Sequence, residues 1–264
     1  MILVTGATGI LGRVIVLELL KRGKTVRATK RKSSNLQEVR KSFQFYTETP
    51  NEYFDSIEWI EVDFEDIHSL QNALNGVEEV YHCAAKVSFH PKDEKKMYQT
   101  NIEGTKQLLF ACQNSSVKKF LFVSSIAVLD GLNENGELDE SSDFNPKIDH
   151  SAYAISKHFS EMEVWRASAE GLNTVIVNPG IIIGSGNWNE SSGTLFKELG
   201  ENAFTFSGGT SYVDVRDVAQ ISIELMEKNI FGERFILVSE SAKYEEIGNS
   251  IRQKLGKSPM KLLP

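Results

Sequence analysis

A tyrosine and a lysine four positions apart offer the clearest chemistry in this sequence. Tyr153 and Lys157 stand in the run YAISK, and this spacing places both side chains on one face of a helix. A phenol has a pKa of about 10, but a nearby ammonium favours the phenolate and lowers that pKa. Ser125, at the end of an apolar run, could hydrogen-bond the same substrate oxygen. The pattern therefore predicts proton transfer at a carbonyl or alcohol oxygen.

Glycines near the N-terminus predict a phosphate-binding turn. The segment TGATGILG, residues 5–12, follows a strand-like run and opens a helical pattern. Gly6 would take the tight turn, Gly9 would admit a pyrophosphate to the helix N-terminus, and Gly12 would let helix and strand pack closely. We expect a dinucleotide here, with contacts from Gly6, Thr8, Gly9, Ile10 and Gly12.

The end of the second strand indicates which dinucleotide is bound. An NAD enzyme would place a carboxylate there for the ribose 2′-hydroxyl, whereas residues 26–33 read VRATKRKS and contain none. Arg31 is the first candidate for a 2′-phosphate contact because a guanidinium can bind phosphate through two hydrogen bonds, and Lys32 is the second. NADP(H) is the preferred cofactor, with NAD(H) as the alternative and a solvated basic loop as the non-functional explanation.

Two further strand ends could contact the adenosine. Asp63 could accept a hydrogen bond from the adenine amino group while Phe64 covers the ring. The small residues Ala84 and Ala85, followed by Lys86, would let the backbone pass close to the cofactor. Either segment could also simply end its strand.

The elements that must position these residues alternate along the chain. Apolar runs at 1–5, 26–29, 57–62, 77–83, 119–124, 174–178 and 234–238 are separated by helical patterns at 10–21, 66–75, 92–114, 152–170, 214–228 and 243–255. Continuously apolar strands between helices predict an α/β fold with a doubly wound parallel sheet, Rossmann-like in type. The carboxyl ends of parallel strands line one crevice, so Ser125 would share it with the pyrophosphate.

We expect a single domain over residues 1–264 with a small C-terminal substrate lobe. Lobe segments are predicted at about 184–212 and 239–264, and the chain is short enough that the lobe is either minimal or truncated. The least regular stretches are 43–56, 130–150 and 184–210, and the last two should border the substrate. Trp188 in that region is a candidate substrate contact.

Composition limits the classes of function. The 264 residues are 41% hydrophobic and 25% charged with a net charge of -7, which is typical of a soluble globular protein and disfavours a nucleic-acid partner. No apolar run is long enough for a membrane helix, and the strand at Met1 leaves no room for a targeting peptide. Cys83 and Cys112 read as buried thiols, and the histidines lack metal-ligand spacing. We expect a cytoplasmic protein without a metal.

Taken together, the motifs resemble the extended short-chain dehydrogenase/reductases, the NAD-dependent epimerase/dehydratase family. The similarity covers nearly the whole chain and rests on TGATGILG, VDFED, HCAA, NIEGT, VSSIAV, YAISK, NPG and YVDVRDVA. It implies a Ser125–Tyr153–Lys157 triad, with Asn101 supporting the lysine through water. It also implies a wall behind the nicotinamide formed by Pro179, Gly180 and Ile182.

Within the family, one departure and one match refine the expectation. Sugar-nucleotide dehydratases carry an Asp-Glu pair after the catalytic hydroxyl, where this chain has Ile126-Ala127, so dehydration is disfavoured. Ser125 rather than Ser124 is chosen because it stands three residues before Val128, as in the family. The segments VRATKRKSS and YVDVRDVA through GERFILVSE are less specific than the triad, and they most resemble the dihydroflavonol-reductase-like and 3β-hydroxysteroid-dehydrogenase-like members. These members act on bulky, often apolar substrates.

The sequence therefore predicts an NADP(H)-dependent oxidoreductase that interconverts a carbonyl and an alcohol on a small bulky substrate. The enzymatic alternative is an NAD-dependent nucleotide-sugar epimerase, and the second alternative is a cofactor-sensing binding protein without turnover. The expected partner is a small-molecule substrate, with no nucleic acid and no membrane. Helices at 92–114 and 152–170 pair in relatives, so a homodimer is also a hypothesis.

Overall fold

A seven-stranded parallel sheet forms the centre of the protein. The computed structural model describes residues 1–186 and 192–263. The strand order is β10-β6-β5-β4-β1-β2-β3, and every pairing in this sheet is parallel. The strands are β1 (Ile2–Thr5), β2 (Val26–Lys30), β3 (Glu58–Glu61), β4 (Glu79–His82), β5 (Lys119–Val123), β6 (Asn173–Pro179) and β10 (Glu233–Leu237). The order reverses between β1 and β4, which is where a doubly wound sheet opens a ligand crevice.

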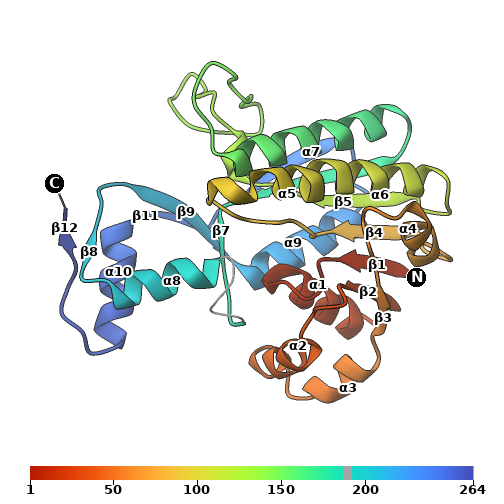
Figure 1. Ribbon diagram of the computed structural model, residues 1–264, viewed down its shortest axis with the longest axis horizontal. Helices are drawn as coiled ribbons and strands as arrows, with labels where there is room; N and C mark the ends of the chain where they lie inside the picture. The colour runs from red at the N-terminus through yellow and green to blue at the C-terminus, as the bar shows by residue number, and fades with distance from the viewer. Residues whose placement is uncertain (187–191, 264) are drawn as a thin grey trace.

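Helices cover both faces of the sheet (Figure 1). One face packs against α1 (Ile10–Lys21) and α9 (Val215–Glu227), with α2 (Leu36–Ser42) and α3 (Pro50–Asp55) beside α1. The other packs against α4 (Ile67–Ala73), α6 (Gly104–Gln113) and α7 (Ala152–Ala169). Because both faces are covered, the central strands are apolar on both sides, and all of β1 is buried. The predicted doubly wound α/β architecture is confirmed.

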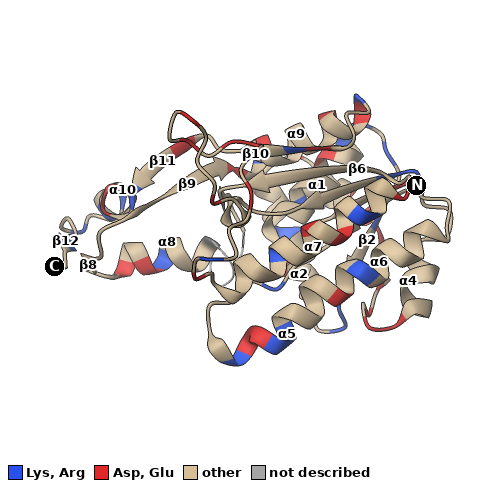
Figure 2. Cartoon of the chain, turned by 90° about the horizontal axis from the view of Figure 1, so that it is seen from above, with Lys and Arg blue, Asp and Glu red and all other residues tan. Residues whose placement is uncertain are grey.

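One predicted helix is interrupted. The helix expected over 92–114 consists of α5 (Glu94–Tyr98), a π-helical turn at Gln99–Glu103 and then α6. The charge run in α5 lies on its outer side, where Glu94, Lys95 and Lys96 are exposed and acidic and basic residues alternate (Figure 2). Single π-helical turns inside α-helices occur frequently at functional sites.

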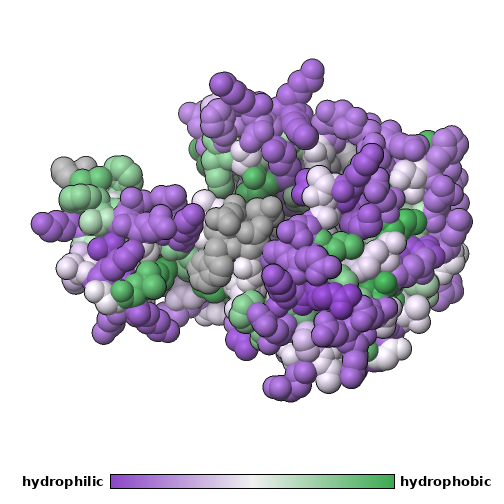
Figure 3. All heavy atoms as spheres, turned by 60° about the horizontal axis from the view of Figure 1, so that its bottom comes forward, coloured by the Kyte–Doolittle hydropathy of each residue, from purple (hydrophilic) through white to green (hydrophobic). Residues whose placement is uncertain are grey.

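A smaller lobe follows β6 and contains more regular structure than the sequence suggested. A three-stranded sheet has the order β11-β9-β7, formed by β7 (Ile181–Ile183), β9 (Gly209–Asp214) and β11 (Glu240–Lys243). A two-stranded sheet pairs β12 (Lys261–Leu262) with β8 (Phe204–Thr205), and the helices are α8 (Ser192–Glu201) and α10 (Tyr244–Lys254). The expectation of irregular chain over 184–210 is therefore wrong for α8 and β8. Apolar side chains are visible on this lobe at the left of Figure 3, and Phe204, Phe206 and Leu262 are exposed.

The segment 130–150 covers the open edge of the large sheet. β10 is an edge strand, and such an edge leaves backbone groups without partners. The Glu140 carboxylate accepts a hydrogen bond from the backbone N–H of Ile236 at 2.9 Å, and Arg234 donates to the carbonyls of Glu140 and Ser142. This long loop is thereby fastened to β10.

Candidate functional site

The glycine turn after β1 is built for close backbone approach. Gly6 has φ +65°, and a Cβ there would lie 2.6 Å from the backbone nitrogen of Ala84. A Cβ on Gly12 would lie 2.3 Å from the Gly6 carbonyl oxygen. Gly9 is the N-cap of α1, and no side chain caps that helix end. The turn therefore presents the helix N-terminus to an anion, so the residues present fit the pyrophosphate of a dinucleotide.

Arg13, which the sequence analysis did not single out, holds this turn in shape. Its buried guanidinium donates to the carbonyls of Thr8 and Gly9 and binds the Glu38 carboxylate at 2.7 and 2.9 Å. These bonds direct the two carbonyls toward Arg13. The signal was a charged residue on the apolar face of α1, between the buried Gly12 and Val14.

The cations after β2 divide into two groups. Arg27 pairs with Glu58 at 2.8 Å, and Lys30 lies 3.4 Å from Glu61, so β3 neutralises both. Arg31 and Lys32 are exposed, and neither has an ion-pair partner within residues 1–186 and 192–263. The structure thus leaves the two residues that the sequence analysis selected available for a phosphate.

The predicted adenosine contacts lie at the ends of β3 and β4. Asp63 is exposed, and its carboxylate accepts a hydrogen bond from the Glu65 backbone N–H. The ring of Phe64 stacks on His82 at 5.8 Å. The segment from Ala84 to Lys86 follows β4, next to Gly6.

The predicted triad residues meet at the carboxyl end of β5. Tyr153 lies in the first turn of α7, and its phenol lies near the Ser125 hydroxyl. Burial raises the pKa of Tyr153, while the neighbouring Ser125 side chain acts in the opposite direction. Ser124 points elsewhere, because its hydroxyl donates to Glu161 at 2.6 Å. Of the two adjacent serines, Ser125 is therefore the one beside the phenol.

Lys157 lies beneath this pair in a buried position. Its ammonium donates to the Val123 carbonyl at 2.6 Å and lies 4.1 Å from the centre of the Phe122 ring. Burial lowers the pKa of Lys157 to about 7, and the charge of Glu161 works against this shift. No hydrogen bond between Lys157 and Tyr153 is formed in this structure among the described residues.

Asn101 lies inside the π-helical turn and is buried. Its amide donates to the Lys86 carbonyl and to the Ser156 hydroxyl, and its oxygen accepts from the Lys86 backbone N–H at 2.7 Å. Asn101 thus ties the chain after β4 to the middle of the YAISK segment. The support of Lys157 through water that the resemblance implies stays a prediction.

The predicted nicotinamide wall lies where β6 passes into the lobe. Pro179 ends β6, and a Cβ on Gly180 would lie 2.5 Å from the Ser211 carbonyl oxygen. Ile182 pairs with Val213 between β7 and β9. These residues connect the seven-stranded sheet to the three-stranded sheet, and β6 lies beside β5, the strand that ends at the candidate triad. Trp188, the predicted substrate contact, lies outside the described residues.

Phe89 is a neighbour of the triad that the sequence analysis missed. It is 78% exposed, and its ring lies 6.2 Å from the Tyr153 ring. An apolar residue in a charged stretch was the only available signal, because nothing local indicates which helix the loop faces. The exposed ring adds an apolar surface beside the phenol.

Among the described residues, no three His, Cys, Asp or Glu side chains gather as metal ligands would. No helix in the described part of the chain has the length and apolar character required to span a membrane.

The fold and the site together define a dinucleotide-binding α/β enzyme with a Ser–Tyr–Lys cluster at its strand ends. The chain belongs to the NAD dependent epimerase/dehydratase family, whose model matches residues 2–237. It is an enzyme of the extended short-chain dehydrogenase/reductase type, and an NAD(P) dinucleotide is the cofactor typical of that family.

Relatives and one solved structure agree with this placement. Sterol demethylase protein B of Methylococcus capsulatus is 31% identical over 93% of this chain and 71% of its own. Cinnamoyl-CoA reductase 2 of Medicago truncatula is 30% identical over 88% and 70%, and dihydroflavonol 4-reductase of Arabidopsis thaliana is 27% identical over 95% and 68%. The crystal structure of gox2253 is 28% identical and aligns with a TM-score of 0.85 over 99% of this chain and 77% of that one.

Proposed function

We propose that this protein is an NADP(H)-dependent oxidoreductase that interconverts a carbonyl and an alcohol on a bulky substrate. The observation that carries the proposal is the gathering of Ser125, Tyr153 and the buried Lys157 at the carboxyl end of β5, on the side of the sheet that also holds the glycine turn. A family member without turnover would have no need for all three side chains together.

The proposed roles follow from charge and position. When bound, the cofactor supplies or accepts the hydride at the substrate carbon. Tyr153 donates the proton to the carbonyl oxygen during reduction, or accepts it from the alcohol during oxidation. Ser125 hydrogen-bonds the same oxygen, and the Lys157 ammonium favours the phenolate form. Asn101 supports the chain that passes beside this cluster.

The preference for NADP(H) rests on Arg31 and Lys32. Both are exposed at the end of β2, where a ribose-binding carboxylate would favour NAD(H). The Arg31 guanidinium would bind a 2′-phosphate through two hydrogen bonds. Gly6, Thr8, Gly9, Ile10 and Gly12 would hold the pyrophosphate, and Asp63, Phe64, Ala84, Ala85 and Lys86 the adenosine end. Pro179, Gly180 and Ile182 would back the nicotinamide.

The substrate class is argued from Phe89 and from the relatives. An exposed aromatic ring near the phenol favours an apolar or aromatic body on the substrate. Two relatives with 27% and 30% sequence identity to this chain are named dihydroflavonol 4-reductase and cinnamoyl-CoA reductase. Ile126 and Ala127 offer no acid or base for eliminating water.

A substrate panel tests the reaction. Aromatic aldehydes and ketones with NADPH should give loss of cofactor absorbance, and Tyr153→Phe should lower turnover by a factor of about 10² or more while NADPH still binds. Equal turnover of the variant and the wild type would refute the role of Tyr153. Conversion of UDP- or dTDP-sugars with NAD and no net cofactor change would favour the epimerase alternative, which the family description supports.

Fluorescence titration tests the cofactor. The protein should bind NADPH more tightly than NADH, and Arg31→Asp should weaken NADPH by a factor of about 10 to 100 while leaving NADH nearly unchanged. Lys24→Asp, which alters a cation at the other end of β2, is the matched control. Unchanged NADPH affinity in the Arg31 variant would contradict the assignment. Tight binding of both cofactors without turnover on any panel member would favour the sensing alternative.

A further inference from the structure

A buried carboxylate lies one helical turn after Lys157. The Glu161 side chain is only 4% exposed and accepts hydrogen bonds on both oxygens. One oxygen accepts from the Ser124 hydroxyl at 2.6 Å and from the Asn178 amide at 3.1 Å. The other accepts from Arg234 at 3.2 Å and from the Trp165 indole at 3.4 Å. Four donors therefore surround this buried carboxylate, which fixes its orientation.

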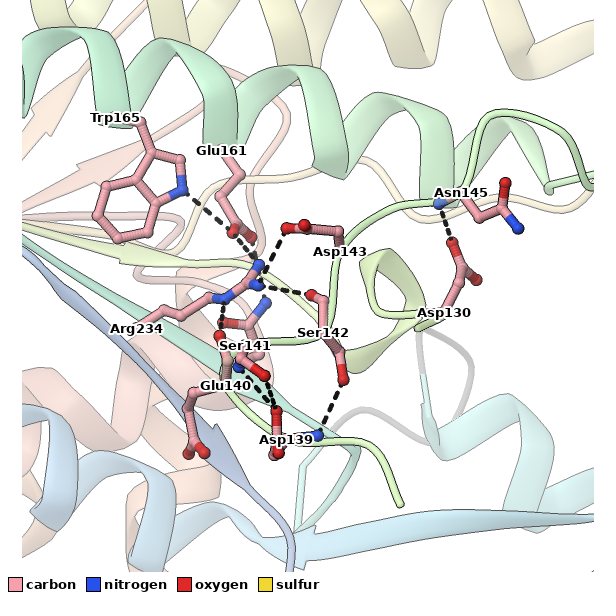
Figure 4. Close-up of polar contacts among 11 residues, drawn as sticks. Asp130, Asp139, Glu140, Ser141, Ser142, Asp143, Asn145, Glu161, Trp165 and Arg234 are labelled. Carbon is pink, nitrogen blue, oxygen red and sulfur yellow. Dashed lines mark hydrogen bonds and ion pairs between the residues drawn. The ribbon is translucent and has the colours of Figure 1, made fainter. Parts of the chain in front are cut away.

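Arg234 supplies the compensating positive charge from the edge of the sheet. Figure 4 shows its guanidinium between Glu161 on α7 and the loop of residues 139–143. Its remaining donors bind the carbonyls of Glu140 and Ser142, and Asp143 lies 3.9 Å away. The guanidinium is therefore fixed from two sides, so it fixes the Glu161 carboxylate in turn.

The carboxylate reaches the candidate triad through Asn178. The amide of Asn178 donates both to Glu161 and to the backbone carbonyl of Ser125, each at 3.1 Å. The Ser124 hydroxyl binds the same carboxylate oxygen, and the Ser124 backbone N–H donates to Val177 at 2.7 Å. The position of Ser125 at the end of β5 thus depends on a chain of contacts that ends at Glu161.

Glu161 is also the carboxylate that acts on Lys157. The other titratable groups that interact with the ammonium are the Cys83 thiol and the His82 imidazole. Burial raises the pKa of the Cys83 thiol to about 12 and lowers the pKa of His82 to about 3, so both are neutral near pH 7. Among these described groups, Glu161 makes the largest contribution that raises the pKa of Lys157.

We propose that Glu161 is a positioning residue, which holds Ser125 in place through Asn178 and sets a carboxylate one helical turn away from Lys157. The proposal rests on the proposed function for the importance of Ser125 and Lys157. The electrostatic coupling between the buried side chains of Glu161 and Lys157 can be measured without substrate.

The first test follows the titration of Lys157 directly. Protein labelled with ¹³C at lysine Cε is titrated by NMR without cofactor, and the Lys157 resonance is assigned by its loss in Lys157→Arg. Glu161→Gln should lower the titration midpoint by about one pH unit, because the negative charge that favours the ammonium is removed. Glu163→Gln on the same helix, where the carboxylate pairs with Arg166 near the surface, should leave the midpoint unchanged.

A double substitution guards against loss of folding. Glu161→Met with Arg234→Met replaces both buried charges by apolar side chains, a change that buried ion pairs often tolerate. It removes the same negative charge and should lower the Lys157 midpoint by a smaller amount, because the Arg234 cation is lost with it. An unchanged midpoint in either folded variant would overturn the proposal.

Kinetics distinguish this proposal from the proposed function. With a substrate from the panel, Glu161→Gln should lower kcat at least tenfold with little change in the KM for NADPH, and its alkaline activity limb should move to lower pH. Activity that needs the charged lysine is present below its pKa and lost as the pH rises through it. A wild-type kcat and pH profile in this variant would overturn the positioning role. If the NMR midpoint shifts but no panel member is turned over, the proposed function fails while the coupling between Glu161 and Lys157 stands.

Discussion

At the scale of single residues, His82 shows how burial sets a protonation state. Its ring nitrogens contact the hydroxyls of Thr5 and Thr105 at 2.7 and 2.9 Å, so it joins β1, β4 and α6. Burial lowers the pKa of His82 to about 3 from its ordinary value of 6.5. Between those two values the unfolded chain binds a proton that the folded chain does not, so stability must fall as the pH falls through that window.

The expected outcome is a measurable dependence of folding stability on this one imidazole. Acidification should cost the wild type up to about 1.4 kcal/mol per pH unit below pH 6.5 from His82 alone. His82→Gln should show a shallower slope, as measured by urea unfolding at about pH 7 and about pH 5. The exposed His68→Gln is the control and should keep the wild-type slope. Equal slopes in all three proteins would contradict the assignment.

Candidate site residues can be chosen from the sequence where a motif fixes its own local geometry. The glycine turn and the Tyr153–Lys157 spacing depend on neighbouring positions, so the sequence displays them. Arg13, Glu161 and Phe89 gain their importance from partners 25, 73 and 64 positions away (Glu38, Arg234 and Tyr153). Such partners are known only when the chain is folded, and a single sequence holds no sign of the pairing.

At the scale of elements, the π-helical turn between α5 and α6 carries the buried Asn101. Its amide makes three hydrogen bonds, to both backbone groups of Lys86 and to Ser156. The turn therefore anchors the loop that bears Phe89 to α7. The sequence analysis predicted one continuous helix because a single extra residue in a turn leaves the apolar periodicity nearly intact.

Removing the anchor should destabilise the protein and loosen that loop. Asn101→Ala leaves two partly buried backbone groups of Lys86 and the buried end of the Ser156 contact without their partner, and should cost about 2–4 kcal/mol in the free energy of unfolding. Asn114→Ala, which removes an exposed hydrogen bond at the end of α6, should cost less than about 1 kcal/mol. Urea unfolding measures both, and hydrogen exchange of the 84–90 segment should accelerate only in the first variant. An equal decrease in the free energy of unfolding for the two variants would show that Asn101 does not anchor the loop.

Sequence patterns located the long elements and missed the short ones. The helices α1, α7, α9 and α10 begin and end within about two residues of the predicted limits, as expected for periodic segments with clear ends. The segment 43–56 was predicted as irregular, yet it includes α3, where Phe54 packs on Phe43 and Trp59. Its stability comes from this aromatic packing rather than from helix propensity.

At the scale of the whole molecule, two neighbouring helices expose large apolar side chains. Phe110 on α6 and Phe159 and Met162 on α7 are each at least half exposed. Exposed apolar surface on adjacent helices is costly in water, and a second copy of the chain would cover it.

We therefore expect a homodimer, with a mass by light scattering of about twice 29.6 kDa. Phe159→Asp should give the monomer mass, because a charge would then be buried in the contact. Phe206→Asp, which changes an exposed phenylalanine of the C-terminal lobe, is the control and should keep the dimer. A monomeric wild type would refute this assembly.

The position of Arg234 at the far end of the sheet has a consequence for how the protein is made. Glu161 and the strand ends that it joins leave the ribosome long before residue 234 does, since synthesis proceeds from the N-terminus. Until β10 docks, the Glu161 carboxylate would lack the Arg234 guanidinium that binds it in the folded protein. The nascent chain must therefore keep that carboxylate hydrated and the edge of β6 uncovered, so final closure of the site is deferred to a late step of translation. Ribosome-bound chains that end before residue 234 should remain sensitive to protease around α7, and chains that extend well past it should become resistant.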